Sequence, residues 1–203
     1  MAGRPRTIDD DRIFAAVATA VGKVGPARLT LADVAREAHA STGAIAQRFG
    51  NKRNLLLSFL RASDILLVMR AAYVSAPDPV TGLVRAVVAS AGPDRSPEEF
   101  ANHLAFLHLD LTDSEFRAVL AEQDAAIWNE MVGYLQSGVA QELLVVDDVD
   151  ALASAINSLR SGTQITWAIG RRGSLADALR RDLNALLAPY HERAMRDRPE
   201  PST

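Results

Sequence analysis

The sequence predicts an all-α fold, and three observations carry this prediction. Apolar residues recur at spacings of three and four along most of the chain, which is the period of an amphipathic helix. Runs of β-branched and aromatic residues with a period of two, which are typical of strands, are missing from the sequence. Gly, Pro and Asp interrupt the helical pattern at intervals that suit helices of ordinary length.

The composition indicates a soluble, cytoplasmic protein. The chain has 203 residues, of which 48% are hydrophobic, so it can bury a sizeable core. It has no cysteine, which excludes disulfides and cysteine-based metal sites. No apolar run approaches the roughly 20 residues that a membrane helix needs, and the N-terminus lacks the apolar segment of a signal peptide.

Charge is divided unevenly along the chain. Residues 1–60 hold nine Lys and Arg against five Asp and Glu, whereas residues 61–203 hold 13 against 20. A basic segment joined to an acidic one favours contact of the first segment with a polyanion such as DNA. Ordinary surface variation is the alternative, because the basic excess is modest.

The first helix is expected to begin at Thr7 as its cap and to end at Gly25, with Pro26 stopping its continuation. A second helix begins after Thr30, and a third runs from Thr42 to Phe49 until Gly50 and Asn51 break it. The buried stripes of the first two helices are Ile13, Phe14, Val17, Ala20 and Val21, and then Leu31, Val34, Ala35 and Ala38.

The second and third helices are joined by the turn 39–41, which is the pattern of a helix-turn-helix. In this motif the second helix enters the major groove of DNA with its N-terminus first, so its start must be small and its back apolar. Ser41, Thr42, Gly43 and Ala44 suit the groove, and Ile45 with Phe49 suits the back. Gln47 and Arg48 would project outward to base edges or phosphates. Some helical bundles share this pattern without binding DNA.

The rest of the chain reads as a helical bundle. A long helix is expected from Arg53 to about Ser75, and the later helices span Val80–Ala91, Pro97–Leu111, Ser114–Leu144, Asp148–Ile169 and Ser174–Ala194. We therefore expect a helix-turn-helix domain over residues 1–52, a helical effector-binding and dimerisation domain over 53–195, and a disordered polar tail over 196–203.

Three stretches resemble the tetracycline-repressor (TetR) family of transcriptional regulators. Residues 29–38, LTLADVAREA, look like the first docking helix of that family, and residues 40–45, ASTGAI, look like its turn and the start of its recognition helix. Residues 49–55, FGNKRNL, look like the closing motif. The resemblance covers roughly residues 8–60, and beyond them it is one of architecture only.

The resemblance implies roles for particular residues. Thr30 would cap its helix and touch a phosphate, Lys52 would lie at a phosphate, and Ala46 stands where the family usually has a tyrosine that contacts the DNA backbone. Arg48 would partly compensate for that loss with a charge-assisted phosphate contact. The residues expected to bind DNA are Arg4, Arg6, Thr30, Ser41, Thr42, Gly43, Ala44, Gln47, Arg48 and Lys52. Arg4 and Arg6 would form a minor-groove arm, with a frayed terminus as the equal alternative.

The second half holds candidates for an effector cavity. In this architecture they lie on helices that surround a central space, and an apolar cavity with a few polar groups suits a small, largely apolar effector. For each of them, an ordinary core position is the alternative. They are Met69, Tyr73, Phe100, His103, Phe106, Leu107, Trp128, Met131, Gln164 and Trp167.

Catalysis and metal binding find no support in the sequence. His103 and His108 are five residues apart and point in different directions on a helix, so they cannot share a metal ion. The chain contains no nucleophile elbow and no Gly-rich phosphate loop. We expect no enzyme activity, no catalytic residue, no metal and no cofactor.

The last two helices are candidates for a dimer interface. Their apolar stripes could form a four-helix bundle with a second copy, with the small residues Ala153, Ala155, Ser158 and Gly162 allowing close approach. Packing of the same stripes within one chain is the alternative. The expected interface residues are Leu152, Ile156, Leu159, Thr163, Leu175, Leu179, Leu183, Leu186 and Tyr190.

The sequence thus predicts a homodimeric, sequence-specific DNA-binding regulator. We expect it to be a repressor that a small apolar effector releases from a palindromic double-stranded operator, with no membrane partner. The alternative is a helical small-molecule-binding or interaction protein whose DNA binding is weakened or lost.

Overall fold

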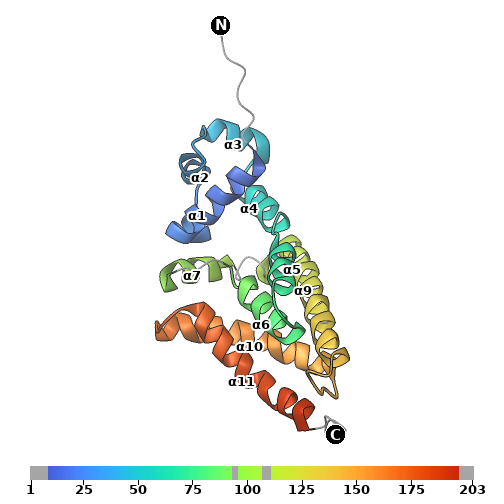
Figure 1. Ribbon diagram of the computed structural model, residues 1–203. Coiled ribbons are helices and arrows are strands. Elements are labelled where there is room, and N and C mark those ends of the chain that lie inside the picture. The colour runs from blue at the N-terminus through green and yellow to red at the C-terminus, as the bar shows by residue number, and fades with distance from the viewer. Residues whose placement is uncertain (1–8, 93–95, 107–110, 197–203) are drawn as a thin grey trace. The chain divides into compact units, whose positions relative to one another are not determined.

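The computed structural model describes residues 9–92, 96–106 and 111–196 (Figure 1). Within these ranges every regular element is a helix, which confirms the predicted all-α fold. None of the described helices is long and apolar enough to cross a membrane. Thr7, His108 and residues 197–203 lie outside the described residues, so the predicted first cap and nearly all of the predicted tail do too.

The chain divides into two compact units. The first unit takes residues 1–63 and 95–121, and the second takes 64–94 and 122–203. The first contains α1 (Asp10–Arg28), α2 (Leu31–Glu37), α3 (Thr42–Phe49), α4 (Lys52–Arg61), α7 (Pro97–Leu104) and the start of α9 (Ser114–Ala140). The second contains α5 (Ile65–Val74), α6 (Pro79–Ser90), the rest of α9, α10 (Val149–Gly170) and α11 (Leu175–Arg196). Packing units need not coincide with functional domains, so the division at residue 52 stays a prediction.

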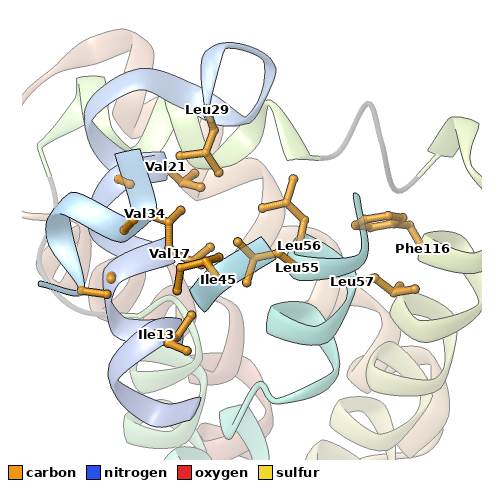
Figure 2. Packing of buried hydrophobic residues seen from close by; sticks show 14 of the residues in the cluster. Ile13, Val17, Val21, Leu29, Val34, Ile45, Leu55, Leu56, Leu57 and Phe116 are labelled. Atoms are coloured by element: carbon orange, nitrogen blue, oxygen red, sulfur yellow. The ribbon is translucent and has the colours of Figure 1, made fainter. Parts of the chain in front are cut away.

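The core of the first unit joins α1 to the two short helices and to α4 (Figure 2). Ile13 and Val17 of α1, Val34 of α2, Ile45 of α3 and Leu55 of α4 are at most 1% exposed. Phe116 of α9 belongs to the same cluster. Ile13 and Val17 lie four residues apart on one face of α1, as the apolar pattern predicts. The burial of this cluster fixes the short helices on α1, because helices of seven and eight residues are too short to be stable alone.

Gly25 breaks the regular backbone of α1 as the sequence predicts, but Pro26 does not stop the helix there. Its backbone takes φ 73°, a left-handed conformation that costs glycine nothing. Pro26 lies in the last helical turn, which continues to Arg28. The helix therefore bends at Gly25 and ends three residues later.

The prediction of a single long helix from Arg53 to Ser75 is wrong. The structure breaks it into α4 and α5, with Ala62, Ser63 and Asp64 between them. Ser63 and Asp64 are poor residues for a helix interior, because their side chains compete for backbone hydrogen bonds. The apolar periodicity on both sides hid this break, which falls on the boundary between the two units.

Two other helices end earlier than predicted. α7 ends at Leu104 and not at Leu111, and α9 ends at Ala140 and not at Leu144. Beyond α9, Glu142 takes a left-handed backbone with φ 56°, and the N–H groups of Leu143 and Leu144 both donate to the Gly138 carbonyl. The predicted ranges of α6, α10 and α11 agree with the structure to within two residues.

In the second unit, α6 packs against α5 and α11, and α10 packs against α11. The rings of Tyr73 and Tyr134 stack with centroids 3.8 Å apart. Gly82 makes room for Tyr73, because a Cβ there would lie 2.7 Å from the ring. The unit is therefore tightly filled where α5, α6 and α9 meet.

Candidate nucleic-acid interface

The first helix of the predicted motif, α2, is capped by Thr30 as expected. The Thr30 hydroxyl accepts a hydrogen bond from the Asp33 N–H at 3.2 Å and donates one to the Asp33 carboxylate at 2.7 Å. The Thr30 N–H donates to the same carboxylate at 3.0 Å, which completes a capping box. The hydrogen bonds from Thr30 lower the pKa of Asp33. Since both Thr30 hydrogens go to Asp33, a phosphate contact by this hydroxyl requires an exchange of partners.

The turn between α2 and α3 depends on a left-handed residue. His39 takes φ 49°, and the Ala40 N–H donates to the Ala35 carbonyl at 2.8 Å. Ser41 then caps α3 by accepting from the Ala44 N–H at 3.1 Å. The sequence indicated the turn but not the strained residue, because histidine carries no pattern that marks a left-handed backbone.

The outer face of α3 is free of packing, as a groove-entering helix requires. Ser41, Thr42, Gly43, Ala44 and Gln47 are exposed. The back of α3 holds the buried Ile45 and the half-buried Phe49, which packs against Phe14 with ring centroids 6.0 Å apart. Ala46 is half-buried and extends no polar group.

Arg48 carries a contact that the sequence did not indicate. Its Nε lies 2.5 Å and its Nη2 lies 2.6 Å from the two carboxylate oxygens of Asp10 at the start of α1. Both side chains are about 40% exposed, so water screens the attraction between the two charges and the ion pair contributes little stability. Arg48 is therefore tied to α1, by a contact that another anion can replace.

Lys52 is also held by its own chain. Its ammonium donates to the Pro26 carbonyl at 3.2 Å and to the Ala27 carbonyl at 3.0 Å. A cation at these carbonyls suits the negative end of α1. An ammonium has three hydrogens, so one donor remains for a phosphate.

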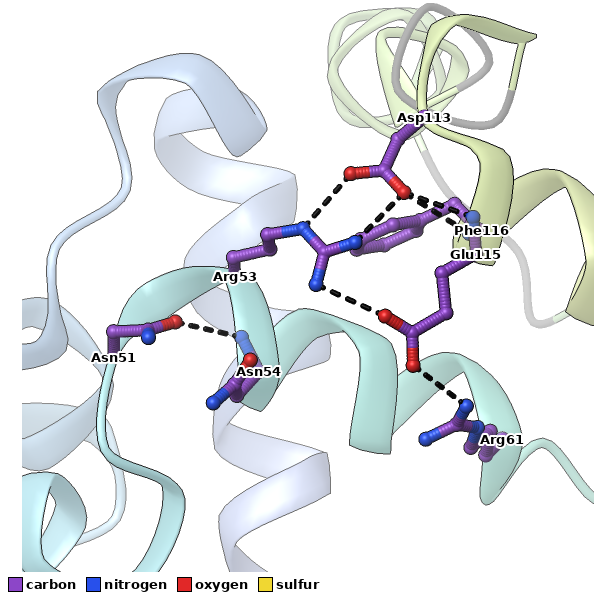
Figure 3. Close-up of polar contacts among 7 residues, drawn as sticks. All are labelled: Asn51, Arg53, Asn54, Arg61, Asp113, Glu115 and Phe116. Carbon is purple, nitrogen blue, oxygen red and sulfur yellow. Dashed lines mark hydrogen bonds and ion pairs between the residues drawn. The ribbon is translucent and has the colours of Figure 1, made fainter.

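A network of charges joins α4 to the start of α9 within the first unit (Figure 3). The Arg53 guanidinium donates to both oxygens of Asp113 at 2.8 Å and to Glu115 at 3.1 Å, and Arg61 donates to Glu115 at 2.9 Å. Arg53 also lies over the Phe116 ring, 5.7 Å from its centroid. The Arg53 hydrogen bonds lower the pKa of Asp113 to about 2, and those from Asp113 and Glu115 raise the pKa of Arg53.

The helices that carry the exposed face of α3 lie within a stretch that is similar to a known protein family. Residues 13–59 match the sequence model of the bacterial regulatory proteins of the tetR family. Residues 13–59 are therefore similar to the DNA-binding segment that this family model describes. No curated protein matches the chain. The matched range ends within α4 and includes all of α2 and α3.

Solved structures show the same fold over nearly the whole chain. A TetR transcription regulator from Haloarcula marismortui has a TM-score of 0.73 at 16% identity, covering 91% of this chain and 96% of its own. A protein from Saccharomonospora viridis, suggested to be a transcriptional regulator and solved with choline, has a TM-score of 0.73 at 22% identity, with 88% and 95% covered. The FadR regulator of Bacillus subtilis, solved with stearoyl-CoA, has 0.67 at 19% identity, with 90% and 100% covered.

The match over residues 13–59, together with this fold, supports DNA-binding transcriptional regulation. The predicted DNA-binding residues from Thr30 to Lys52 lie on or beside the helix-turn-helix. Arg4 and Arg6 lie outside the described residues, so the predicted arm stays a prediction.

The candidate effector residues are divided between the two units. Phe100, His103 and Phe106 belong to the first unit, and Leu107 lies outside the described residues. The others belong to the second unit and are Met69, Tyr73, Trp128, Met131, Gln164 and Trp167. Met69 and Met131 are fully buried, and the Trp167 indole N–H donates to the Gly173 carbonyl at 3.0 Å. The predicted cavity therefore stays a prediction.

A pocket of about 490 Å³ lies elsewhere in the second unit, between the start of α6, the segment after α9 and α11. Thr81, Asn184 and His191 give it a polar side, and Val80 and Leu187 an apolar one. The His191 ring is held by the Leu143 carbonyl, 2.8 Å from Nδ1. Asp78 at its edge is engaged as the cap of α6 through Val80, Thr81 and the Thr81 hydroxyl.

Most of the predicted dimer residues pack within their own chain. Leu152, Ile156 and Thr163 of α10 are buried, as are Leu175, Leu179 and Leu183 of α11. Thr163 donates to the Asp182 carboxylate at 2.8 Å, which ties α10 to α11. Leu159, Leu186 and Tyr190 are half-buried. Six of the nine predicted residues are therefore buried within their own chain, and the predicted dimer interface stays a prediction.

Proposed function

We propose that this regulator binds a specific operator through the exposed face of α3 and represses transcription until a small effector releases it. The observation that carries the proposal is the division of α3, whose outer face from Ser41 to Ala44 and at Gln47 is exposed while Ile45 is fully buried. Such a helix can enter the major groove without disturbing the core that holds it.

Arg48 and Lys52 supply the charge for the DNA backbone in this proposal. Arg48 would exchange the Asp10 carboxylate for a phosphate, and the cost is small because an exposed ion pair contributes only about 0.2–1 kcal/mol. Lys52 would keep its two carbonyl partners and give its third hydrogen to a phosphate. Arg48 thereby takes the anchoring role that Ala46 cannot perform.

The test is binding of the protein to the DNA that flanks its own gene, measured by gel shift and by fluorescence anisotropy over a range of salt. Arg48→Ala should weaken binding and reduce the slope of log affinity against log salt by about 0.9, the value for one lost phosphate contact. If affinity and slope stay unchanged, Arg48 does not contact the backbone.

Asp10→Asn tests the exchange from the other side. Removing the competing carboxylate should raise DNA affinity about two- to fivefold. Asp11→Asn is the matched control. Asp11 is the next residue, its side chain is exposed, and it is not part of the ion pair, so the variant removes the same charge without freeing Arg48. Weaker binding of Asp10→Asn would show that Asp10 orients Arg48 and does not compete for it.

Release from DNA by an effector would act through the ion pairs that join α4 to the start of α9. α9 belongs to the first unit up to residue 121 and to the second from residue 122. Its first turn holds α4 through Arg53 and Arg61. An effector that shifts α9 would therefore move the helix that follows α3. The neighbours solved with choline and with stearoyl-CoA support a small-molecule effector without identifying it. An effector that binds the second unit and leaves operator affinity unchanged would refute this mechanism.

The proposed homodimer uses the outer face of α10. Ala155, Ser158, Gly162, Ile165 and Ile169 lie alternately three and four residues apart and are all exposed, with Ile165 42% and Ile169 78% exposed. A Cβ added at Gly162 meets no atom within 4 Å. Small residues followed by two isoleucines at this spacing suit close packing against the same face of a second copy.

Ile165→Glu tests this interface. It should convert a dimer into a monomer in sedimentation equilibrium, because a charge would be buried at a self-complementary contact. Val74→Glu is the control, since Val74 is an exposed apolar residue on α5, away from the α10 stripe. A dimer that persists in Ile165→Glu would place the interface elsewhere.

The competing function is a small-molecule-binding or interaction protein without DNA binding. Ala46, and the engagement of Arg48 and Lys52 with their own chain, favour it. The gel shift separates the two functions, because the competing protein would leave the flanking DNA unshifted at low salt.

A further inference from the structure

One guanidinium in the second unit has a buried N–H donor without an acceptor. Arg160 lies on α10, and its Nη2 donates to the Asn157 side-chain oxygen at 3.0 Å. Its Nη1 is 3.5 Å from the Ser90 hydroxyl of α6, at the limit of a hydrogen bond. Its Nε is buried and has no acceptor. Among the described residues this state is shared only by Asp10 Oδ1, which has Arg48 as its ion-pair partner.

The charge of Arg160 is also poorly balanced. No carboxylate of the described residues lies within ion-pair distance of it. Asp124 of α9 acts on Arg160 from farther away and is bonded instead to the Asn157 amide at 3.2 Å. Burial lowers the pKa of Arg160, and the Asp124 charge opposes that effect. Natural structures rarely leave a buried charged donor unsatisfied, because the lost hydration is not replaced.

The side chains one helical turn from this cluster are aliphatic and buried. They are Val87 of α6, Ile127 of α9 and Ile156 of α10, each three or four residues from Ser90, Asp124 or Arg160. Three helices of one unit therefore bring a cation with one unsatisfied donor, Nε, to the edge of an apolar interior. A ligand that suits both parts has an apolar body and one anionic group.

We propose that Arg160 is the anion-binding residue of the effector site and that the effector is an aliphatic carboxylate. Its two oxygens would accept hydrogen bonds from Nε and a neighbouring Nη, which is the bidentate geometry that guanidinium and carboxylate share. An anion held there would contact Arg160 of α10 and the Ser90 hydroxyl of α6, while Asp124 of α9 stays bonded to the Asn157 amide. This inference rests on the proposed effector-responsive function and names the chemical class of its ligand.

The test uses the full-length protein and three probes with the same ten-carbon chain: decanoate, 1-decanol and decyltrimethylammonium. Isothermal titration calorimetry without DNA should show decanoate binding at least about tenfold more tightly than decanol, the lower end for a charge-assisted hydrogen bond. Decyltrimethylammonium should bind more weakly than decanol, because its positive charge would face Arg160.

Arg160→Met should remove the preference for decanoate while leaving decanol binding unchanged within about twofold. Arg160→Lys keeps the charge but loses the fork, so it should show an intermediate preference. Arg85→Met is the matched control: Arg85 is exposed on α6 in the same unit and donates to the Ser75 carbonyl. It should keep the full preference of the wild type.

Equal binding of decanoate and decanol to the wild type would overturn the proposal, whether or not Arg160→Met folds. A preference that survives in Arg160→Met would also overturn it, as would tighter binding of the ammonium probe. DNA is absent from this assay, so its failure is distinguishable from failure of the proposed regulator, which the gel shift with flanking DNA measures separately.

Discussion

The two units of the molecule differ in the polar groups that they bury. Both have ion pairs at the surface, such as Arg48 with Asp10 in the first unit and Arg193 with Asp147 in the second. Among the described residues, the buried polar side chain is Thr163 of the second unit, which bonds to Asp182, and in the same unit the buried Nε of Arg160 has no acceptor. The second unit therefore adds a buried polar contact between two helices to its apolar packing.

This difference has a consequence for function. Surface ion pairs contribute little stability, so the first unit can exchange them for DNA phosphates at small cost. An enclosed polar group cannot exchange partners with water, so it selects what can approach it. The first unit is thus suited to binding a polyanion, and the second to discriminating among small ligands.

The largest expected effect is loss of the first unit's core. Ile45→Ala should lower the free energy of unfolding by about 2–5 kcal/mol, because Ile45 is fully buried between α3, α1 and α4. Urea denaturation followed by circular dichroism measures it. Arg53→Met is the comparison, and a loss in that variant as large as in Ile45→Ala would show that surface pairs hold the unit together.

A smaller loss is expected from an enclosed polar contact of the second unit. Thr163→Val keeps the shape of the side chain but removes its donor to Asp182, which should cost about 1–3 kcal/mol. The same denaturation experiment checks it, with Thr166→Val as control, because Thr166 is exposed and bonds only within α10. Equal stability of the two variants would show that the Thr163–Asp182 hydrogen bond does not stabilise the fold.

The turn of the helix-turn-helix offers a change of opposite sign. His39 takes φ 49°, where a residue with a side chain costs roughly 1–2 kcal/mol and glycine costs nothing. His39→Gly should therefore raise stability by about 0.5–1 kcal/mol after the extra freedom of glycine in the unfolded chain is counted. Thermal denaturation measures the change, and a lower melting temperature would mean that the His39 side chain makes a stabilising contact.

The smallest effect is a dependence of stability on pH. Arg53 lowers the pKa of Asp113 from 3.8 to about 2, so the folded state holds this proton less tightly than the unfolded chain does. The contribution is present above about pH 4 and disappears as the pH falls through 4 towards 2. Asp113→Asn should flatten the stability profile in that window, and an unchanged profile would mean that the pair is fully screened.

Local patterns were sufficient to predict most of the fold. The cap at Thr30, the break at Gly25 and the bounds of α3 depend on residues within a few positions of each other. The break between α4 and α5 was missed because the apolar residues on both sides outweighed Ser63 and Asp64. The buried face of α10 was predicted, but burial against α11 and burial against a second copy give the same pattern.

Long-range contacts were beyond sequence reasoning. Arg48 meets Asp10 across 38 positions, and Arg53 meets Asp113 across 60. A single sequence does not say which acid a given arginine will face. The missing acceptor of Arg160 is visible only once three helices are placed around it.

The central claim is that the exposed face of α3 reads a DNA sequence. The most direct measurement is the ratio of affinities for a duplex from the DNA flanking the gene and for a scrambled duplex of equal length, at one salt concentration. The wild type should prefer the flanking duplex by at least about 10³-fold, and Gln47→Ala should reduce that preference by about tenfold if Gln47 contacts a base edge. Equal affinity of the wild type for both duplexes would contradict the account.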